Sequence, residues 1–244
     1  MLETTEAERL ATGFIFTEGP LWHPEGYWYF VDIRQNKLFR LTPGKEPEVV
    51  RNTIGGNGTT FDLQGRLVVC EGDDRRLTQM DADGKVQSLV DNYKGGRFNR
   101  PNDVVCHSNG CLYFTDPDKR RPYNEREISG PEGDNNLWDG ACIYRLAPDG
   151  QLERARALQY PNGLALSPDE RMMYVANTRS SQYIHRIKLD AAGTFAPPGA
   201  VCGYAPAPSR PALPQPAPSQ PAPSQLAPWR RSRPPPWATA PAAI

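Results

Sequence analysis

The stretch EGPLWHPEGYWYFVD, from Glu18 to Asp32, sets the pattern of the chain, because three later stretches can be laid over it. Each begins with Glu or Asn, usually beside Gly, and runs as a short apolar strand through a polar turn into a second apolar strand. The later stretches are NGTTFDLQGRLVVCE from Asn57, NDVVCHSNGCLYFTD from Asn102 and NGLALSPDERMMYVAN from Asn162. A unit that recurs in this way predicts a repeat architecture.

Each unit then continues into a third strand and a reverse turn marked by PG, DG or AG. Units of about 40 residues with three or four antiparallel strands are typical of propeller blades. We therefore predict an all-β fold, a partial β-propeller of about four blades over residues 1–197. A β-sandwich would also supply short strands, but it does not account for four superimposable units. The third unit is longer because residues 117–139 insert a loop, and the fourth lacks a clear final strand.

The composition changes near residue 197, where the repeat also ends. Pro, Ala, Ser and Gln dominate from Pro206 onward, and this stretch contains no acidic residue. Such a segment buries too little apolar surface to offset its ordering entropy. We predict that residues 198–244 form a disordered Pro/Ala-rich low-complexity tail. The near-repeat PAPSQPAPSQ favours an altered reading frame, and a polyproline ligand for a partner domain is the alternative.

Charge and cysteine usage exclude several classes of protein. The 28 basic residues balance the 28 acidic ones, which argues against nucleic acid or an anionic membrane as a partner. The opening MLETTEAERLATG lacks the apolar core of a secretory signal, and no run approaches the roughly 20 apolar residues of a membrane span. Five cysteines without a C-x-x-C pair suggest neither a disulfide framework nor a zinc ribbon. These features predict a cytoplasmic protein.

The residues that open the four repeats are the candidate functional residues. In a propeller, equivalent positions of different blades converge on the central channel, so Glu18, Asn57, Asn102 and Asn162 should ring one of its ends. One carboxylate with several amide oxygens is a hard-oxygen set, suited to Ca²⁺, Mg²⁺ or Mn²⁺ more than to Zn²⁺. An isolated Asn-Gly would usually be only a turn. Their equivalence in the repeat makes a cation site the better interpretation.

The chain resembles the SMP-30/gluconolactonase/regucalcin-like family over roughly residues 8–196. The resemblance depends on FTEGPLWHP around Glu18, RPNDVV at 100–105, LYFTDP at 112–117 and YPNGLALSPDERMMYVANT at 160–178. It implies a propeller of the six-bladed type, one divalent cation in the channel, and hydrolysis of sugar lactones. By motif, Glu18 and Asn162 resemble the family's metal ligands. Arg100 and Asn102 resemble its substrate-contacting pair, with Asn102 close enough to share in the metal's ligand shell.

One departure from the family pattern concerns its third ligand, an Asp in the fifth blade that is also a candidate general base. The corresponding stretch here, APAPSRPALPQPAP, carries no carboxylate, so no catalytic residue is assigned. Fewer carboxylates weaken the binding of hard cations. Asp103 and Asp116 are expected to have structural roles, with Asp116 left open as a substitute ligand.

The function expected from this pattern is metal-dependent hydrolysis of a small sugar lactone by a carboxylic ester hydrolase, with the activity of this form in doubt. The cation would be calcium, with zinc, magnesium, manganese or iron as alternatives. A non-catalytic calcium-binding propeller is the second reading, and a protein that interacts through its proline-rich tail is the third. A serine-hydrolase triad is not expected, because no G-x-S-x-G occurs and His23 and His107 fall in turns away from the channel mouth.

The repeat count also leads to an expectation about association. Four blades do not readily close a ring, so sheet faces and edges should be left uncovered. We expect low stability and self-association through these open propeller edges.

Overall fold

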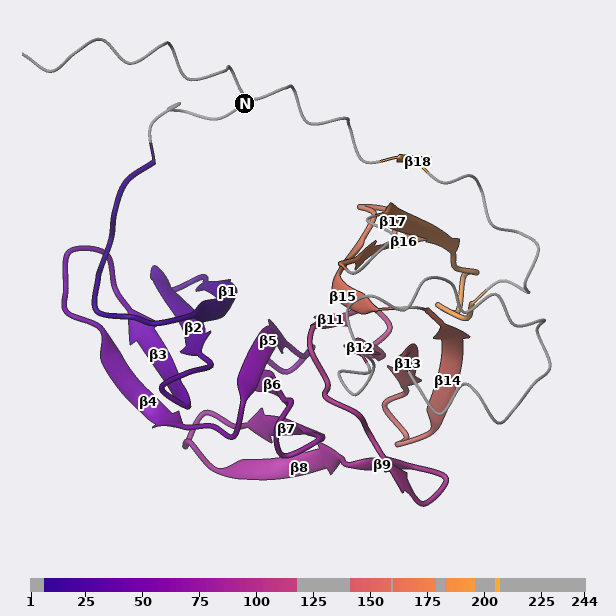
Figure 1. The fold of residues 1–244 in the computed structure, drawn as a ribbon, viewed down its shortest axis with the longest axis horizontal. Coiled ribbons are helices and arrows are strands. Elements are labelled where there is room, and N and C mark those ends of the chain that lie inside the picture. The colour runs from indigo at the N-terminus through magenta and orange to yellow at the C-terminus, as the bar shows by residue number, and fades with distance from the viewer. Residues whose placement is uncertain (1–6, 118–140, 159, 179–182, 196–204, 207–244) are drawn as a thin grey trace, which may run out of the picture. The chain divides into compact units, whose positions relative to one another are not determined.

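The computed structural model describes residues 7–117, 141–158, 160–178, 183–195 and 205–206. All regular structure in these ranges is β-strand (Figure 1). Residues 1–208 form one compact unit, and the second unit, 209–244, lies outside the described residues. No helix in the described ranges is long and apolar enough to cross a membrane.

Four antiparallel sheets succeed one another along the chain, each with four strands in sequence order. The first sheet contains β1 (Thr17–His23), β2 (Tyr27–Asp32), β3 (Lys37–Leu41) and β4 (Glu48–Asn52). The second contains β5 (Gly56–Phe61), β6 (Leu67–Glu71), β7 (Arg76–Met80) and β8 (Val86–Val90). The third contains β11 (Val104–Cys106), β12 (Leu112–Asp116), β13 (Cys142–Leu146) and β14 (Leu152–Ala157). The fourth contains β15 (Pro161–Leu166), β16 (Met172–Asn177), β17 (Tyr183–Lys188) and β18 (Ala205–Pro206). A hairpin of β9 (Asn92–Tyr93) and β10 (Gly96–Arg97) joins the second sheet to the third.

Each sheet corresponds to one sequence repeat, so the predicted β-propeller with four blades is confirmed. The first strands of successive blades pack on one another, β1 on β5, β5 on β11 and β11 on β15. These inner strands carry the repeat-opening residues or directly follow them, which brings the candidate functional residues toward one another. The inserted loop predicted at 117–139 lies outside the described residues apart from Pro117.

The final strand of the fourth blade comes from a segment that the sequence assigned to the tail. Ala205 pairs with Ile184, and Pro206 pairs with Tyr183, so β18 completes the sheet. The prediction that this unit lacks a final strand was therefore wrong. Composition could not reveal β18, because a proline-rich stretch argues against a strand in the middle of a sheet. An edge strand tolerates proline, since its N–H group need not donate to a further neighbour.

The core lies between blades and repeats from one blade to the next. Val31 and Leu38 of the first blade pack with Leu67 and Val69 of the second. Similar clusters join the second blade to the third around Phe98 and the third to the fourth. Successive side chains of a strand point to opposite faces of the sheet, so the apolar residues of each blade can pack on the blade before it and on the blade after it.

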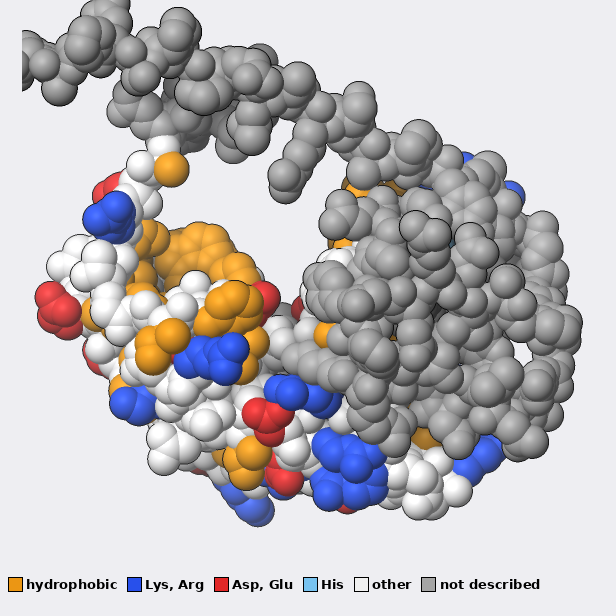
Figure 2. Space-filling view, viewed as in Figure 1, with side chains coloured by type: hydrophobic (Ala, Val, Ile, Leu, Met, Phe, Trp, Pro, Cys, Tyr) orange, Lys and Arg blue, Asp and Glu red, His pale blue; other side chains and the backbone are white. Residues whose placement is uncertain are grey.

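The first blade has an apolar face that packs on the N-terminal segment. Phe30, Phe39 and Leu41 form a buried cluster against Ala11 and Phe14. A cavity of about 680 Å³ opens beside this cluster. Figure 2 shows hydrophobic side chains gathered over this blade. The exposed large apolar residues of the N-terminal segment and the first blade are Leu10, Ile15, Phe16, Trp22 and Val49.

A polar residue ends the second strand of every blade and is buried. The four residues are Asp32, Glu71, Asp116 and Asn177. In three blades this side chain accepts an N–H from the segment just before the inner strand: Ile15 N to Asp32 Oδ2 at 2.7 Å, Arg100 N to Asp116 Oδ1 at 2.7 Å, and Tyr160 N to Asn177 Oδ1 at 2.7 Å. Glu71 instead pairs with Arg51 at 2.6 Å and Arg76 at 2.8 Å. We call these residues the strand-end polar residues; in three blades they fix the approach of the chain to the opening position.

Candidate functional site

The four repeat-opening residues lie at the start of the inner strands. Glu18 is in β1, Asn57 in β5 and Asn162 in β15, while Asn102 precedes β11 by two residues. An irregularity in the pairing with the second strand follows in three blades, between Glu18 and Leu21, Gly56 and Thr59, and Pro161 and Leu164. Bulges of this kind change the direction of a side chain that would otherwise follow the pleat.

Hydrogen bonds to backbone carbonyl oxygens connect the opening positions of neighbouring blades. Gly58 N donates to Asn102 O at 2.7 Å, which joins the second blade to the third. Thr115 Oγ1 donates to Asn162 O at 2.7 Å, which joins the third to the fourth. The first blade is tied in the same manner, because Thr59 Oγ1 donates to Gly19 O at 2.8 Å. The structure therefore links all four opening positions in one series.

Two glycines in this series have no room for a side chain. A Cβ at Gly19 would clash with the carbonyl oxygen of Asn57, and a Cβ at Gly58 would clash with Asp103. Gly19 also has a positive φ of 56°, which L side chains rarely adopt. The Gly beside the opening residue, seen in the sequence as part of the repeat, is required for this close approach.

The side chains of the opening residues are available to a ligand. Asn57 and Asn102 are only 8% and 7% exposed, and Glu18 and Asn162 are half-buried. Within the described residues, no hydrogen bond engages the side chain of any of the four. Polar groups in buried positions normally have partners, so these oxygens and amides suit water, a cation or a polar substrate.

The donor set fits a hard cation in chemistry but carries little charge. One carboxylate and three amide oxygens are ligands of the kind that calcium accepts. Among the described residues, no group of three His, Cys, Asp or Glu side chains is placed to hold a metal ion. The opening residues contain one acidic side chain only, so they would not form such a group.

Asp103 is a site residue that sequence reasoning placed among structural acids. Its carboxylate accepts Val104 N at 2.9 Å and Leu164 N at 3.0 Å, so it spans the third and fourth blades. Burial raises the pKa of Asp103 to about 6; the two backbone N–H groups oppose this shift and the nearby charge of Glu18 adds to it. The sequence signal that could have revealed Asp103 is that it replaces the Gly found after the opening residue in the other three repeats.

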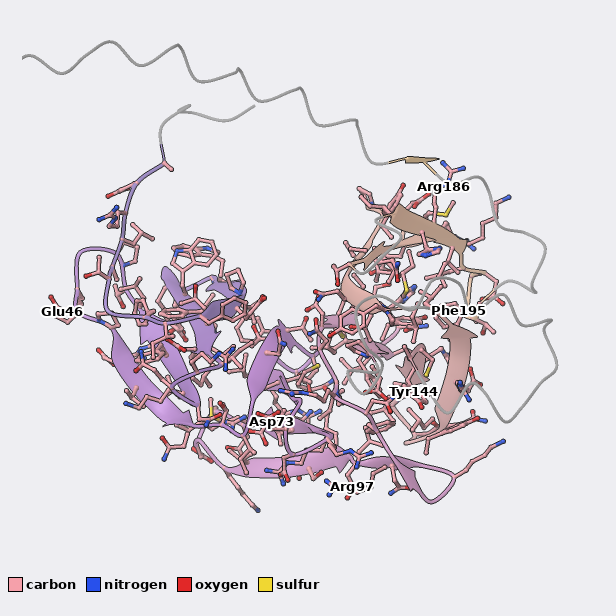
Figure 3. The ribbon with its side chains drawn as sticks, viewed as in Figure 1. Glu46, Asp73, Arg97, Tyr144, Arg186 and Phe195 are labelled. Carbon is pink, nitrogen blue, oxygen red and sulfur yellow. The ribbon has the colours of Figure 1, made fainter. Side chains whose placement is uncertain are left out.

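Arg100 is held by partners that the sequence did not predict. Its guanidinium forms an ion pair with Asp73, whose place in the fold is labelled in Figure 3. The side chains of Arg100 and Asp73 are 34% and 46% exposed. The pair is therefore accessible to a ligand that could compete for the arginine.

Asp116 does not have the character of a substitute ligand. Its Oδ1 accepts Arg100 N at 2.7 Å, and its Oδ2 accepts Asn99 N at 2.9 Å and Asn99 Nδ2 at 3.2 Å. It is fully buried. Both oxygens are thus engaged in holding the segment that carries Arg100 and Asn102, which agrees with its expected structural role.

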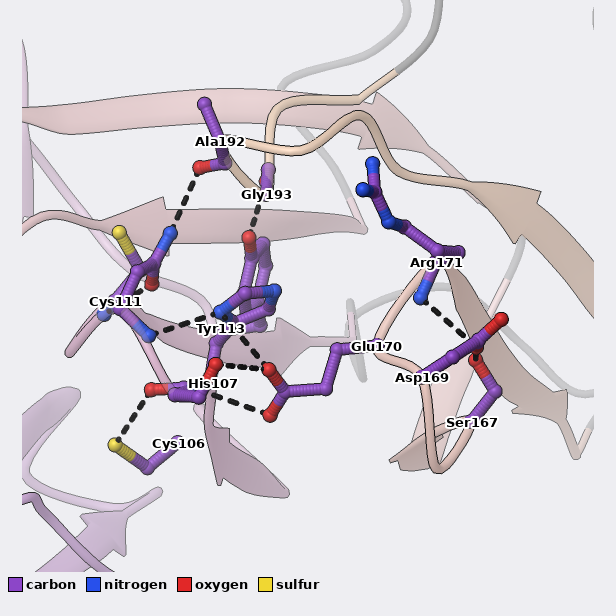
Figure 4. Close-up of polar contacts among 12 residues, drawn as sticks. Cys106, His107, Cys111, Tyr113, Ser167, Asp169, Glu170, Arg171, Ala192 and Gly193 are labelled. Atoms are coloured by element: carbon purple, nitrogen blue, oxygen red, sulfur yellow. Dashed lines mark hydrogen bonds and ion pairs between the residues drawn. The ribbon is translucent and has the colours of Figure 1, made fainter.

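His23 and His107 lie at turns, as predicted. His23 ends β1, and His107 follows β11 in the turn closed by Gly110 N donating to His107 O at 2.8 Å. Figure 4 shows that His107 contacts Glu170, with 3.4 Å between Nδ1 and Oε2. Ser108 Oγ donates to the same Glu170 oxygen rather than to the imidazole, so the group lacks the serine-to-histidine contact of a hydrolase triad.

Comparison with known families is consistent with this architecture. The sequence profile of the family described as "SMP-30/Gluconolactonase/LRE-like region" matches residues 16–211, most of the chain. The chain belongs to this family. The resemblance inferred from the motifs is thereby confirmed.

Individual relatives support membership of the SMP-30/gluconolactonase family. A gluconolactonase from Zymomonas mobilis is 33% identical over 208 residues, which are 78% of this chain and 57% of the relative. A solved gluconolactonase structure from Xanthomonas campestris superposes with a TM-score of 0.63 at 32% identity, covering 75% of this chain and 61% of the other. A calcium-binding regucalcin from Agrobacterium tumefaciens, at 22% identity and a TM-score of 0.58, shows the shared fold, with 75% and 57% covered. The chain spans about three fifths of the length of these relatives.

Proposed function

We propose that this member of the SMP-30/gluconolactonase family acts on sugar lactones at the ring of opening residues, with a divalent cation as cofactor. The observation that supports this most is the hydrogen-bonded series of opening positions, whose oxygen-bearing side chains have no partner in the described protein. The gluconolactonases among its relatives give the substrate class.

In this proposal Glu18, Asn102 and Asn162 hold the cation, and calcium suits their oxygens best. A bound divalent cation would supply Lewis acidity toward an ester carbonyl. The protein's own residues would bind and orient the substrate. Arg100 would release Asp73 and bind hydroxyl groups of the lactone instead. The buried amide of Asn102 would fix the orientation of the lactone.

The charge of the site sets the expected affinity. Glu18 is the only carboxylate among the opening residues, and the stretch 205–218, where the family resemblance leads us to expect a fifth-blade ligand, carries none. Calcium sites with few charged ligands bind at about 10⁻⁴ to 10⁻³ M. We therefore expect weak cation binding in that range.

Hydrolysis of glucono-1,5-lactone, followed by proton release in a weakly buffered solution, tests the proposal. Activity should appear with calcium or manganese, disappear with a chelator, and fall at least 100-fold in Glu18→Gln. Glu48→Gln is the matched control, because Glu48 belongs to the same blade but forms an exposed ion pair with Arg40 at 2.9 Å. Equal activity in Glu18→Gln and Glu48→Gln would reject the site.

A calcium-binding protein without turnover is the second candidate. It is favoured by the single carboxylate of the site, because holding a cation requires fewer groups than catalysis does. Calcium binding that depends on Glu18, with no hydrolysis of any lactone tested, would support this alternative.

A further inference from the structure

One repeat departs from the others at the position directly after the opening residue. Three repeats have glycine there, at Gly19, Gly58 and Gly163, whereas the third repeat has Asp103. Gly58 allows the Asp103 carboxylate to approach the backbone of the second blade closely. Its Oδ1 lies against Gly58, and a Cβ at Gly163 would be 3.7 Å from its Oδ2.

The carboxylate of Asp103 joins two inner strands. Oδ1 accepts Val104 N of its own blade at 2.9 Å, and Oδ2 accepts Leu164 N of the fourth blade at 3.0 Å. Leu164 lies two residues after Asn162, at the irregularity of the β15 pairing. One oxygen of Asp103 therefore fixes the strand that presents Asn162.

The backbone of Asp103 completes the connection through Thr115. Asp103 N donates to Thr115 Oγ1 at 3.1 Å, and Thr115 N donates to Asp103 O at 2.9 Å. The same Thr115 hydroxyl donates to Asn162 O at 2.7 Å. The backbone around Asn162 is thus held at two points, at Asn162 O by the Thr115 hydroxyl and at Leu164 N by the Asp103 carboxylate. Asn102 directly precedes Asp103 in the chain.

We propose that Asp103 is the positioning residue of the candidate site: with Thr115, it holds Asn102 and Asn162 at the separation that a shared cation requires. This inference depends on the proposed function for the cation. Residues that orient metal ligands through hydrogen bonds typically change metal affinity about 10- to 100-fold when they are replaced.

A carboxylate is suited to this position in a way that an amide is not. Both oxygens of Asp103 accept backbone N–H groups, from Val104 and Leu164. In Asp103→Asn, the amide nitrogen replaces one of the oxygens and must face an N–H donor, although the volume is unchanged. The variant therefore loses one of the two strand connections with little change in packing.

The experiment compares Asp103→Asn with a matched control, Asp81→Asn. Asp81 Oδ1 also accepts two backbone N–H groups, from Asp83 at 3.1 Å and Lys85 at 2.8 Å, but it lies in the outer turn between β7 and β8. Dissociation constants for Mn²⁺ and Ca²⁺ are measured by calorimetry, and thermal unfolding is measured without added cation. Asp103→Asn should weaken cation binding about 10- to 100-fold, and Asp81→Asn should leave it unchanged.

Thr115 provides a second pair of variants, should Asp103→Asn fail to fold. Thr115→Ser keeps the hydroxyl and should bind the cation like the parent. Thr115→Val keeps the shape but loses the bond to Asn162 O, and should weaken binding to an extent similar to Asp103→Asn. Cation affinity equal to the parent's in both folded Asp103→Asn and Thr115→Val would overturn the positioning role, even if both variants melt at a lower temperature.

Cation binding by the parent protein and by Glu18→Gln distinguishes a failure of this inference from a failure of the proposed function. Cation binding that is lost in Glu18→Gln but retained in Asp103→Asn and Thr115→Val leaves the proposed function standing and removes only the role of Asp103. A parent that binds no divalent cation overturns the proposed function, and the positioning role with it.

Discussion

At the scale of single residues, the ion pair of Arg100 with Asp73 leads to a prediction about substrate binding. A lysine cannot reproduce the planar, forked hydrogen bonds of a guanidinium. If Arg100 binds lactone hydroxyls, Arg100→Lys should raise KM about 10-fold with a smaller change in kcat, since charge-assisted hydrogen bonds contribute about 1.5–3 kcal/mol. Steady-state kinetics on a series of lactones provides the measurement.

Asp73→Asn is the companion variant for this prediction. It removes the exposed partner of Arg100 without removing the arginine. KM should therefore stay the same or fall, because the substrate no longer competes with a carboxylate for the guanidinium. A KM that rises equally in Asp73→Asn and Arg100→Lys would mean that the ion pair matters only for local structure.

Glu170 gives a prediction for acid stability. The Ser108 hydroxyl holds the pKa of Glu170 below its ordinary value despite the opposing effect of burial, and the Ser108 N–H and His107 add to this. A lowered pKa in the folded state contributes stability above the unfolded value, about 4.3, which is lost as the pH falls through the folded value. Glu170→Gln should cost about 1 kcal/mol at pH 7.

The pH dependence separates this effect from a general loss of packing. Unfolding free energies measured between pH 3 and 7 should fall less steeply at the acid end in Glu170→Gln than in the parent. Ser108→Ala should show an intermediate slope, because it removes the largest cause of the shift and keeps the carboxylate. Parallel curves for all three proteins would contradict the assignment.

At the scale of strands and blades, the strand-end polar residues carry a prediction about stability. Asp32 is fully buried, and its carboxylate accepts N–H groups from Ile15, Phe16, Arg34 and Gln35. Asp32→Ala leaves these donors without their acceptor and should cost about 3 kcal/mol in the free energy of unfolding. Asp81→Ala, which frees two donors in an exposed turn, should cost less than half as much in denaturant titrations.

The sequence repeat predicted the blades and the opening residues well, because both follow from local pattern. Strand alternation, turns and the recurrence of Glu or Asn beside Gly are visible within about 15 residues. The same alignment places Asp32, Glu71, Asp116 and Asn177 at one position, so the strand-end polar residues could also have been found. Their role as acceptors depends on contacts with the segment before each inner strand, which the repeat pattern does not specify.

Contacts between blades could not be predicted from the same pattern. The bond from Leu164 N to Asp103 joins residues 61 positions apart, and the ion pair of Arg100 with Asp73 joins two different blades. Both depend on how successive sheets pack, which the repeat does not specify. The pairing of Ala205 and Pro206 with β17 could not be predicted for another reason. Their composition suggested a tail, whereas they form a strand because they pair with the edge of the fourth sheet.

At the scale of the whole molecule, the uncovered apolar side chains lead to a prediction about association. Ile15 and Phe16, in the segment that leads into the first blade, are 69% and 52% exposed. Exposed apolar patches favour association, so we expect the protein to self-associate at micromolar concentration. Ile15→Ser with Phe16→Ser should shift sedimentation velocity profiles toward monomer, whereas Leu63→Ser, equally exposed at 56% on the second blade, should have less effect.

A monomer that melts in one sharp cooperative transition, with the same sedimentation profile at all concentrations, would contradict this expectation. It would indicate that the four blades with their N-terminal segment are sufficient for a stable fold.

Crystallography with manganese shows whether opening residues from different blades share one cation. Crystals of the full chain soaked in Mn²⁺ would be measured at a wavelength where manganese scatters anomalously. We expect a single strong anomalous peak about 2.0–2.6 Å from the Glu18 carboxylate and from the Asn162 side-chain oxygen. A peak bound elsewhere, or Glu18 and Asn162 side chains directed away from each other with no peak between them, would contradict it.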